Sequence, residues 1–371
     1  MIEWQKDRAY ARRALAQVLS GANVELRNDD IGSVEALLAV AKAEGVAVLV
    51  AQRFASGPDA AGSMLHAAFA KAAREAAVVF MLRDIECRKV LGVLQTGSVP
   101  VLLLKGSSLA YWLYGEPKAR ECCDIDILVP SRAEADHVGA LLAVNDYTQI
   151  YAPGDQGYEM LLSRRADSGG VRLDLDVHWR LVNAAMFAGV FDFDTLYSAS
   201  IPLPTLASNA RGLCPVHALM HACIHRAINL YSGVGDRLKW LYDLHLLAKR
   251  FCDAEWQELY RVCGQHQLNG VCLAGLEATA ELFGNAAPSA ALESLRDGSA
   301  RESLDSTRLH DWSYMERRNF AALKSLRTRA RWLWQRLFPS LAYLQELYGS
   351  GQGRPSLLWH RFRRLLLRLN S

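Results

Sequence analysis

Long parts of the chain place apolar residues three and four positions apart, which is the spacing of a helix that buries one face. Segments with this pattern cover 33–55, 62–95, 215–232, 236–251 and 254–285. The Gly- and Pro-containing stretch 55–63 separates the first two, because both residue types interrupt helices. The pattern predicts helices through 1–95 and again beyond 200.

Between these helical regions, β-branched and leucine residues form short runs that predict buried strands. The run SVPVLLLKG at 98–106 ends in glycine, and the run CDIDILVP at 123–130 ends in proline. A short helix is expected over 107–115 with Ser107 or Ser108 as its cap, because serine side chains accept hydrogen bonds from the first helical N–H groups. A capped amphipathic helix is expected over 131–145.

Residues 156–179 predict a β-hairpin with its turn at 166–170. In the second strand, VRLDLDVHW, apolar and polar residues alternate at every position. Side chains of a strand point alternately to the two faces, so one face would be apolar and the other would carry charge. Such a sheet usually packs helices on its apolar face.

These patterns predict an α+β fold, in which a small mixed sheet with helices on one face is embedded in mostly helical regions. The expected division is a helical N-terminal region at 1–95, a sheet-containing core at 96–200, a helical region at 201–300 and a basic helical region at 301–371.

Charge is unevenly distributed along the chain. Residues 301–371 contain 14 Lys/Arg and 5 Asp/Glu, a net charge of +9, whereas the whole chain has only +3. The favoured interpretation is a solvated helix face that packs on the body. Binding of nucleic acid or another polyanion, or contact with a membrane surface, are the alternatives.

No stretch reaches about 18 consecutive apolar residues, so no membrane span is expected. The N-terminus lacks the uninterrupted apolar segment of a secretory signal. The eight cysteines form no CxxC pair and are expected to be reduced. A cytoplasmic protein fits these features.

Two predicted strands carry acidic pairs, Asp124 with Asp126 and Asp174 with Asp176. Residues i and i+2 of a strand lie on one face, about 6.6 Å apart. Two carboxylates at that distance repel by about 2.5 kcal/mol at an effective dielectric of ~20, so in a cleft they need a cation. Mg²⁺ is the expected ion, because it prefers carboxylate oxygens together with substrate phosphates.

The turn KGSS, which ends the first predicted strand, suits phosphate binding. Gly106 allows close approach of the backbone to a ligand, and a helix that begins at Ser107 or Ser108 presents free N–H groups. Lys105 and Arg120 are candidate charge partners for the phosphate.

A strand ending in a Gly-Ser turn, then an Asp-x-Asp strand and then a third acid on a later strand resembles the polymerase-β-like nucleotidyltransferases. More narrowly, residues 102–129 together with LDVHWRL at 175–181 resemble a bacterial group of uncharacterised nucleotidyltransferases, the nucleotidyltransferase-5 group. The resemblance is specific over about 100–182. It implies a polymerase-β-like core within the predicted α+β fold, and members of the group often lie in biosynthetic gene clusters.

The resemblance also implies roles for individual residues. Gly106 and Ser107 would hold the β- and γ-phosphates of an NTP, and Asp124 and Asp126 would hold two Mg²⁺ ions, for which Mn²⁺ could substitute. Asp176 would be the third carboxylate, which holds metal and helps to activate the acceptor.

Other side chains near these acids have open roles. Asp174 shares a face with Asp176 and is its rival as third carboxylate, while Arg172 either joins the site or only neutralises Asp174. His178 either orients Asp176, relays a proton near pH 7 or has a hydrogen-bonded structural role.

Two helices downstream carry further candidates. Asp243 is a candidate to reach the cleft. His217, His221 and His225 share a helix face with a spacing that could bind metal, but a polar helix face is favoured.

The expected function is Mg²⁺-dependent transfer of a nucleoside monophosphate from an NTP to an acceptor, with release of pyrophosphate. The resemblance favours a small metabolite or a peptide as the acceptor, and nucleic acid is not favoured. The alternatives are a non-catalytic nucleotide-binding or scaffold module and a γ-phosphoryl transferase with the same core.

Overall fold

A computed structural model of the 371-residue chain describes residues 2–22, 31–55, 63–150, 157–166 and 170–339, with a few isolated positions beyond 340. The α-helices are α1 (Ile2–Leu19), α2 (Ile31–Glu44), α3 (Ala47–Ala55), α4 (Met64–Thr96), α5 (Lys105–Leu109), α6 (Arg132–Ala143), α7 (Phe193–Ser198), α8 (Pro215–Ser232), α9 (Leu238–Arg250), α10 (Asp253–His266), α11 (Asn269–Phe283), α12 (Ser289–Ser299), α13 (Trp312–Ala321) and α14 (Leu326–Leu337). Two 3₁₀ turns are η1 (Pro117–Ala119) and η2 (Ser306–Arg308). The strands are β1 (Leu102–Leu103), β2 (Ile125–Leu128), β3 (Thr148–Gln149), β4 (Glu159–Arg165), β5 (Arg172–His178), β6 (Ile201–Pro202) and β7 (Arg211–Gly212).

The strands form one mixed sheet in the order β3-β4-β5-β2-β1-β7-β6. The predicted hairpin is the pair β4 and β5, which is antiparallel throughout. β2 lies parallel to β5, and β1 is antiparallel to β2 and parallel to β7. A mixed sheet surrounded by helices confirms the predicted α+β class.

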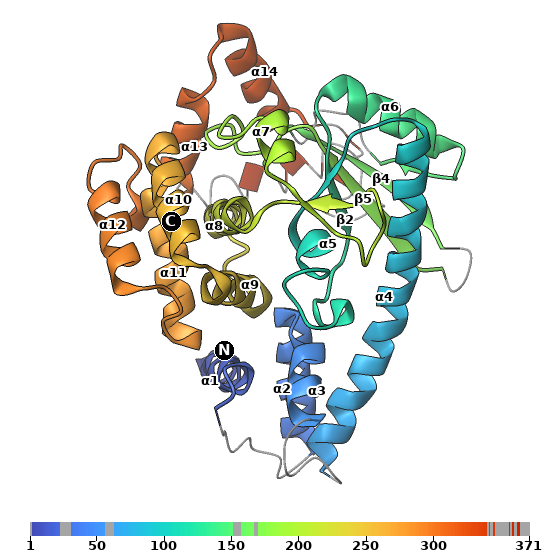
Figure 1. The fold of residues 1–371 in the computed structure, drawn as a ribbon, viewed down its shortest axis with the longest axis vertical. Coiled ribbons are helices and arrows are strands. Elements are labelled where there is room, and N and C mark those ends of the chain that lie inside the picture. The colour runs from blue at the N-terminus through green and yellow to red at the C-terminus, as the bar shows by residue number, and fades with distance from the viewer. Residues whose placement is uncertain are drawn as a thin grey trace.

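The two faces of the sheet have different chemistry, as the alternating pattern predicts. Ile125, Ile127, Leu175 and Val177 belong to an apolar cluster that also contains buried residues of α4 and α6. In Figure 1, α4 and α6 lie on one side of the sheet and α8 lies on the other. The acidic residues of β2 and β5 alternate with the apolar ones, so they belong to the face opposite α4 and α6.

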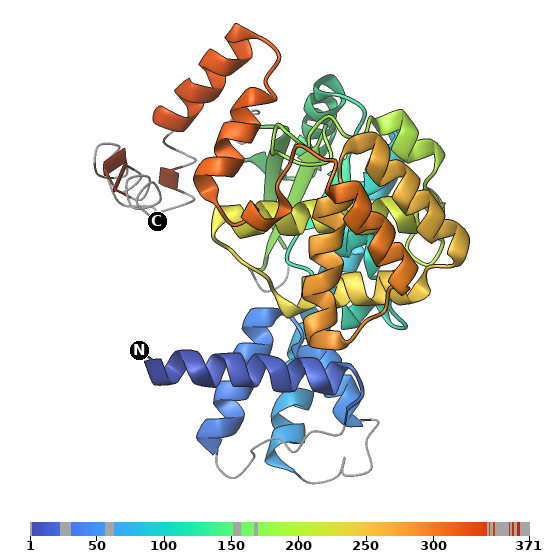
Figure 2. The same cartoon turned by 90° about the vertical axis from the view of Figure 1, so that its left-hand side faces the viewer.

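A second apolar cluster joins distant parts of the chain. It contains Leu15 of α1 and Val50 of α3 together with Leu219, Leu241 and Leu276 from the helices that follow the sheet. Figure 2 shows α1 crossing the base of the molecule beneath those later helices. The division into four regions stays a prediction, since the core does not separate the first region from the third.

Several expected boundaries differ from the structure. The helix expected over 33–55 is divided into α2 and α3 at Gly45, whose φ of +69° lies in the left-handed region that glycine adopts readily. The expected strand 98–106 pairs only through the two residues of β1. Most of the break at 55–63, and most of the expected basic helical region beyond residue 340, lie outside the described residues.

The cap predicted at Ser107 or Ser108 is wrong, because α5 already begins at Lys105 and both serines lie inside it. No helix among the described residues combines the length and the apolarity that crossing a membrane requires.

Candidate active site

The acids Asp126 and Asp176 meet because β2 and β5 run parallel in the register that places them directly opposite each other. Asp126 is 2% exposed and Asp176 is partly buried. Asp124 directly precedes β2 and is also partly buried. The sheet therefore brings all three predicted carboxylates to one end of one face.

Asp126 is held by two basic groups. Its Oδ1 lies 2.6 Å from Lys105 Nζ and 3.2 Å from His178 Nε2. Burial opposes the ionised form, but Lys105 and His178 outweigh it and hold the pKa of Asp126 below its ordinary value. Asp126 is therefore ionised and already paired in the free protein.

Lys105 has a constrained backbone, since its φ of +48° is in the left-handed region that non-glycine residues rarely adopt. Such strain costs of order 1–3 kcal/mol and concentrates at functional sites. In this protein, the residue with the strained backbone is the one whose ammonium forms the ion pair with Asp126.

Asp176 lacks a comparable pairing with basic groups among the described residues. Burial, followed by repulsion from Asp126 and Glu159, raises its pKa to about 8. One ligand atom each from Asp126, Asp176 and His178 lie within 4.8 Å of one another, which is close enough to hold a metal ion. The residues therefore fit a divalent cation, whose charge would favour the ionised form of Asp176.

The composition of this trio differs from the predicted one. His178 takes part, while the Asp124 carboxylate lies outside the trio. Repulsion from Asp126 and burial raise the pKa of Asp124. Carboxylates favour Mg²⁺ or Mn²⁺, and an imidazole also suits transition metals.

Sequence reasoning missed Glu159, which faces His178 across the β4–β5 pair. Its Oε2 lies 3.4 Å from His178 Nδ1, so His178 sits between Glu159 and Asp126. Counting equally from the turn expected at 166–170 pairs position 159 with 177, one residue short of the observed partner His178, so the sequence did not place Glu159 at the site.

The Gly-Ser turn is fastened to β2. The Ser107 hydroxyl lies 3.2 Å from the Asp124 carbonyl oxygen and 3.2 Å from the Asp126 N–H, donating to the first and accepting from the second. A Cβ at Gly106 would lie 2.6 Å from Cys122 Sγ, so only glycine fits between α5 and the segment before β2.

Arg120 and Asp243, two of the predicted candidates, bind each other. Arg120 donates to both Asp243 oxygens at 2.6–3.1 Å, the Tyr114 hydroxyl donates to Asp243 at 2.6 Å, and both charged side chains are about 95% buried. This pair ties the segment before β2 to α9. A phosphate-binding role for Arg120 stays a prediction, and its charge is already balanced.

Arg172 and Asp174 also pair with each other, at 2.7 Å, toward the exposed end of β5. Asp174 is not part of the trio around Asp176. The choice between Asp174 and Asp176 as third carboxylate stays a prediction, and the position opposite Asp126 favours Asp176.

The histidines of α8 do not form a solvated face. His221 is 2% exposed, and burial together with the nearby Lys105 charge lowers its pKa to about 3, so it is neutral. It lines a small pocket together with Lys105 and Ser108.

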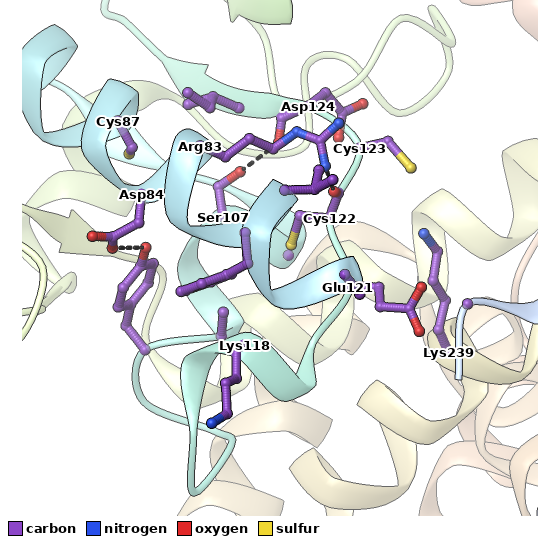
Figure 3. A pocket seen from close by; sticks show the side chains of 18 of the residues that line it. Arg83, Asp84, Cys87, Ser107, Lys118, Glu121, Cys122, Cys123, Asp124 and Lys239 are labelled. Atoms are coloured by element: carbon purple, nitrogen blue, oxygen red, sulfur yellow. Dashed lines mark hydrogen bonds between the residues drawn. The ribbon is translucent and has the colours of Figure 1, made fainter. Parts of the chain in front are cut away.

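A larger cavity, of about 260 Å³, opens beside the acids and is bordered by α4, α5, α9 and the segment before β2. Figure 3 shows Arg83, Ser107, Asp124 and Lys239 around it. Asp124 lines this cavity, whereas Asp126, Asp176 and His178 do not. The cavity, which has room for phosphate, therefore lies at the Asp124 end of the acidic group. The three residues that could hold a metal ion lie at the other end.

No curated protein matches the chain. A family model described as an uncharacterised nucleotidyltransferase matches residues 32–284, which include the sheet, the three carboxylates, the Gly-Ser turn and the helices around the cavity. The match covers well over half of the sequence, and the chain therefore belongs to this family of nucleotidyltransferases.

Proposed function

We propose that the protein transfers a nucleoside monophosphate from an NTP to an acceptor in a reaction that depends on Mg²⁺, with Mn²⁺ as a substitute. The observation that carries the proposal is the direct opposition of Asp126 and Asp176 on neighbouring parallel strands, with the Gly-Ser turn fastened beside them. Family membership supports the general reaction class.

Asp124, Asp126 and Asp176 would hold the metal ions, with His178 as a further ligand or an orienting group. Bound metal supplies charge neutralisation at the phosphates and a lower pKa for the attacking acceptor oxygen. Gly106 and Ser107 line the cavity, and in this proposal they contact the β- and γ-phosphates.

Lys105 has a role at two stages in this proposal. In the free protein it neutralises Asp126. With a cation at that carboxylate, the Lys105 ammonium would be free to pair with a phosphate, for which a mobile point charge is effective. Arg120 keeps the segment in place through Asp243.

The transfer step is an in-line displacement at the α-phosphorus. The acceptor oxygen forms a bond to phosphorus, its proton passes to Asp176, and the bond to the bridging oxygen breaks so that pyrophosphate leaves. The charge of a bound cation would favour the ionised form of Asp176, in which it could accept this proton.

The proposed acceptor class is a small metabolite or a peptide, with nucleic acid not favoured. A cytoplasmic location belongs to the same proposal, and all eight cysteines are free thiols in keeping with it.

The experiment supplies NTP labelled at the α-phosphate, Mg²⁺ or Mn²⁺, and pools of candidate acceptors. We expect label in an acceptor together with release of pyrophosphate, and a loss of more than about 100-fold in Asp124→Asn and Asp126→Asn. Asp136→Asn is the control, since this exposed acid of α6 lies in an ordinary surface pair with Arg132.

Other outcomes identify the alternatives. Label that transfers only from the γ-position indicates a γ-phosphoryl transferase. NTP binding that survives both substitutions, without turnover on any acceptor, indicates a binding module and contradicts the proposed activity.

A further inference from the structure

Basic side chains from several separate helices line the cavity beside Asp124, together with the acids Asp84 and Glu121. Lys42 of α2, Arg83 of α4 and Lys239 of α9 line it, as does Lys118 of η1. Lys42 and Lys118 are about half exposed and pair with Glu75 and Glu116, so they are ordinary surface charges. Arg83 and Lys239 are different.

The side chain of Lys239 is buried along its stem, and its ammonium faces the cavity. Its side chain is 7% exposed, and the described part of the chain offers it no hydrogen bond and no ion pair. Gly45 of the α2–α3 turn lacks the Cβ that would collide with the Lys239 stem, so the stem is held in a fitted channel. An ammonium at the wall of a cavity can form a charge-assisted hydrogen bond with an anionic ligand there.

Arg83 has unused hydrogen-bonding capacity. Its Nη1 donates to the Cys122 carbonyl oxygen, which orients the guanidinium over the segment before β2. Its Nε is buried and has no partner. Figure 3 shows the Arg83 side chain reaching toward Asp124 and the Lys239 side chain at the other side of the cavity.

The charges of both cations act on Asp124, where they favour the ionised carboxylate. The cavity also contains Ser107 but none of Asp126, Asp176 and His178. An in-line displacement requires the leaving group and the acceptor to lie on opposite sides of the phosphorus. The cationic cavity thus has the position of the leaving group, and the Asp176 end has that of the acceptor.

We propose that Lys239 and Arg83 bind the β- and γ-phosphates of the NTP, so that pyrophosphate forms in the cavity between α4 and α9. This assignment rests on the nucleotidyl transfer proposed above. Lys239 and Arg83 are positioning residues for the phosphate chain. The two residues belong to α4 and α9, which lie outside the sheet. Bound phosphates would therefore link these two helices to the core during the reaction.

The test measures binding of inorganic tripolyphosphate to the full chain by calorimetry, without any acceptor. We expect Lys239→Met to weaken binding by about 10–100-fold, because a charge-assisted hydrogen bond is lost, and Arg83→Met to act in the same direction. Lys118→Met is the matched control, since it removes a cation from the rim of the same cavity and should change Kd less than threefold.

A thermal melt of each variant without ligand separates ligand binding from a structural role. Methionine keeps the packed stem of Lys239 and removes the unpaired charge, so Lys239→Met should keep or raise the Tm. A lowered Tm would indicate that the ammonium stabilises the fold and would overturn the proposal.

Unchanged tripolyphosphate affinity in Lys239→Met would also overturn it, as would wild-type protein that does not bind tripolyphosphate. The α-label transfer assay decides the proposed function separately. If wild-type protein and Lys239→Met transfer label equally well at every NTP concentration, the phosphate assignment fails and the transferase activity stands.

Discussion

Asp176 lowers the stability of the free protein at neutral pH. Its pKa is about 8 in the folded chain, because of burial and the nearby Asp126 and Glu159, and about 3.9 in an unfolded chain. Between these two values the folded state binds more protons, so the free energy of unfolding falls as pH rises from about 4 to about 8. Functional acids often have this cost.

Asp176→Asn should therefore stabilise the metal-free protein, by roughly 1–2 kcal/mol at pH 8, with the gain shrinking toward zero near pH 4. Urea denaturation in EDTA at several pH values measures this difference. In millimolar Mg²⁺ the order should reverse, since only the wild-type site gains from the ion. A variant that is less stable than wild type at pH 8 in EDTA would contradict this view of Asp176.

A second prediction at the residue scale concerns Gly106. The Cβ of an alanine at this position would press on Cys122 Sγ. Gly106→Ala should cost roughly 1–3 kcal/mol of unfolding free energy through overpacking. Cys122→Ala should recover at least about 1 kcal/mol of that loss, which a double-mutant cycle in urea measures. Strictly additive effects would show that the two positions do not press on each other.

The acidic pairs could be found in the sequence because each lies in or beside a strand whose alternation fixes its face. That pattern gives Asp124 with Asp126 and Asp174 with Asp176, and the family resemblance favours Asp176 over Asp174. Lys239 and Arg83 could not be found in this way, because each lies on an amphipathic helix where a basic residue is ordinary. Only the packing of α4 and α9 around one cavity distinguishes them from surface cations.

At the scale of elements, periodicity identified the long helices and the β4–β5 hairpin but missed β3, β6 and β7. Each of these strands has two residues, too few to show any alternation. The start of α5 was also missed, since it depends on a left-handed φ at Lys105 that no local rule predicts for lysine. Tertiary contacts, such as the ion pair to Asp126, hold that conformation.

The link between η1 and α9 depends on one buried ion pair, Arg120 with Asp243. Asp243→Ala would leave Arg120 and the Tyr114 hydroxyl unpaired, and we expect a loss of about 3–5 kcal/mol of unfolding free energy. The double variant Arg120→Met/Asp243→Leu should lose less than Asp243→Ala alone, because no buried charge remains.

Chemical denaturation tests this link, with Glu258→Ala on the surface of α10 as the control. Glu258 pairs with Arg261 in solvent and should contribute little to stability. If Asp243→Ala resembled Glu258→Ala, the pair would not fasten η1 to α9.

At the scale of the whole molecule, the N-terminal helices and the helices after the sheet share one apolar cluster. The boundaries expected from composition follow changes in local pattern, and a local pattern contains no information about which helices pack together. The basic region at 301–371 shows the same limit, because its charge is evident in the sequence while its partner is not.

The shared cluster predicts that these helices unfold together, and Glu44 of α2 offers the means to test it. Glu44 is 2% exposed, accepts a hydrogen bond at 2.8 Å from Leu238 N–H at the start of α9, and pairs with Arg8 and Arg12 of α1. Glu44→Ala should cost roughly 2–3 kcal/mol, because it leaves a buried N–H and two cations without their acceptor. Hydrogen exchange followed by mass spectrometry should show lower protection in α1 and in α9 alike, while exposed Glu75→Ala on α4 should change neither. Independent N-terminal and later helical units would instead lose protection separately, and denaturation would then show two transitions.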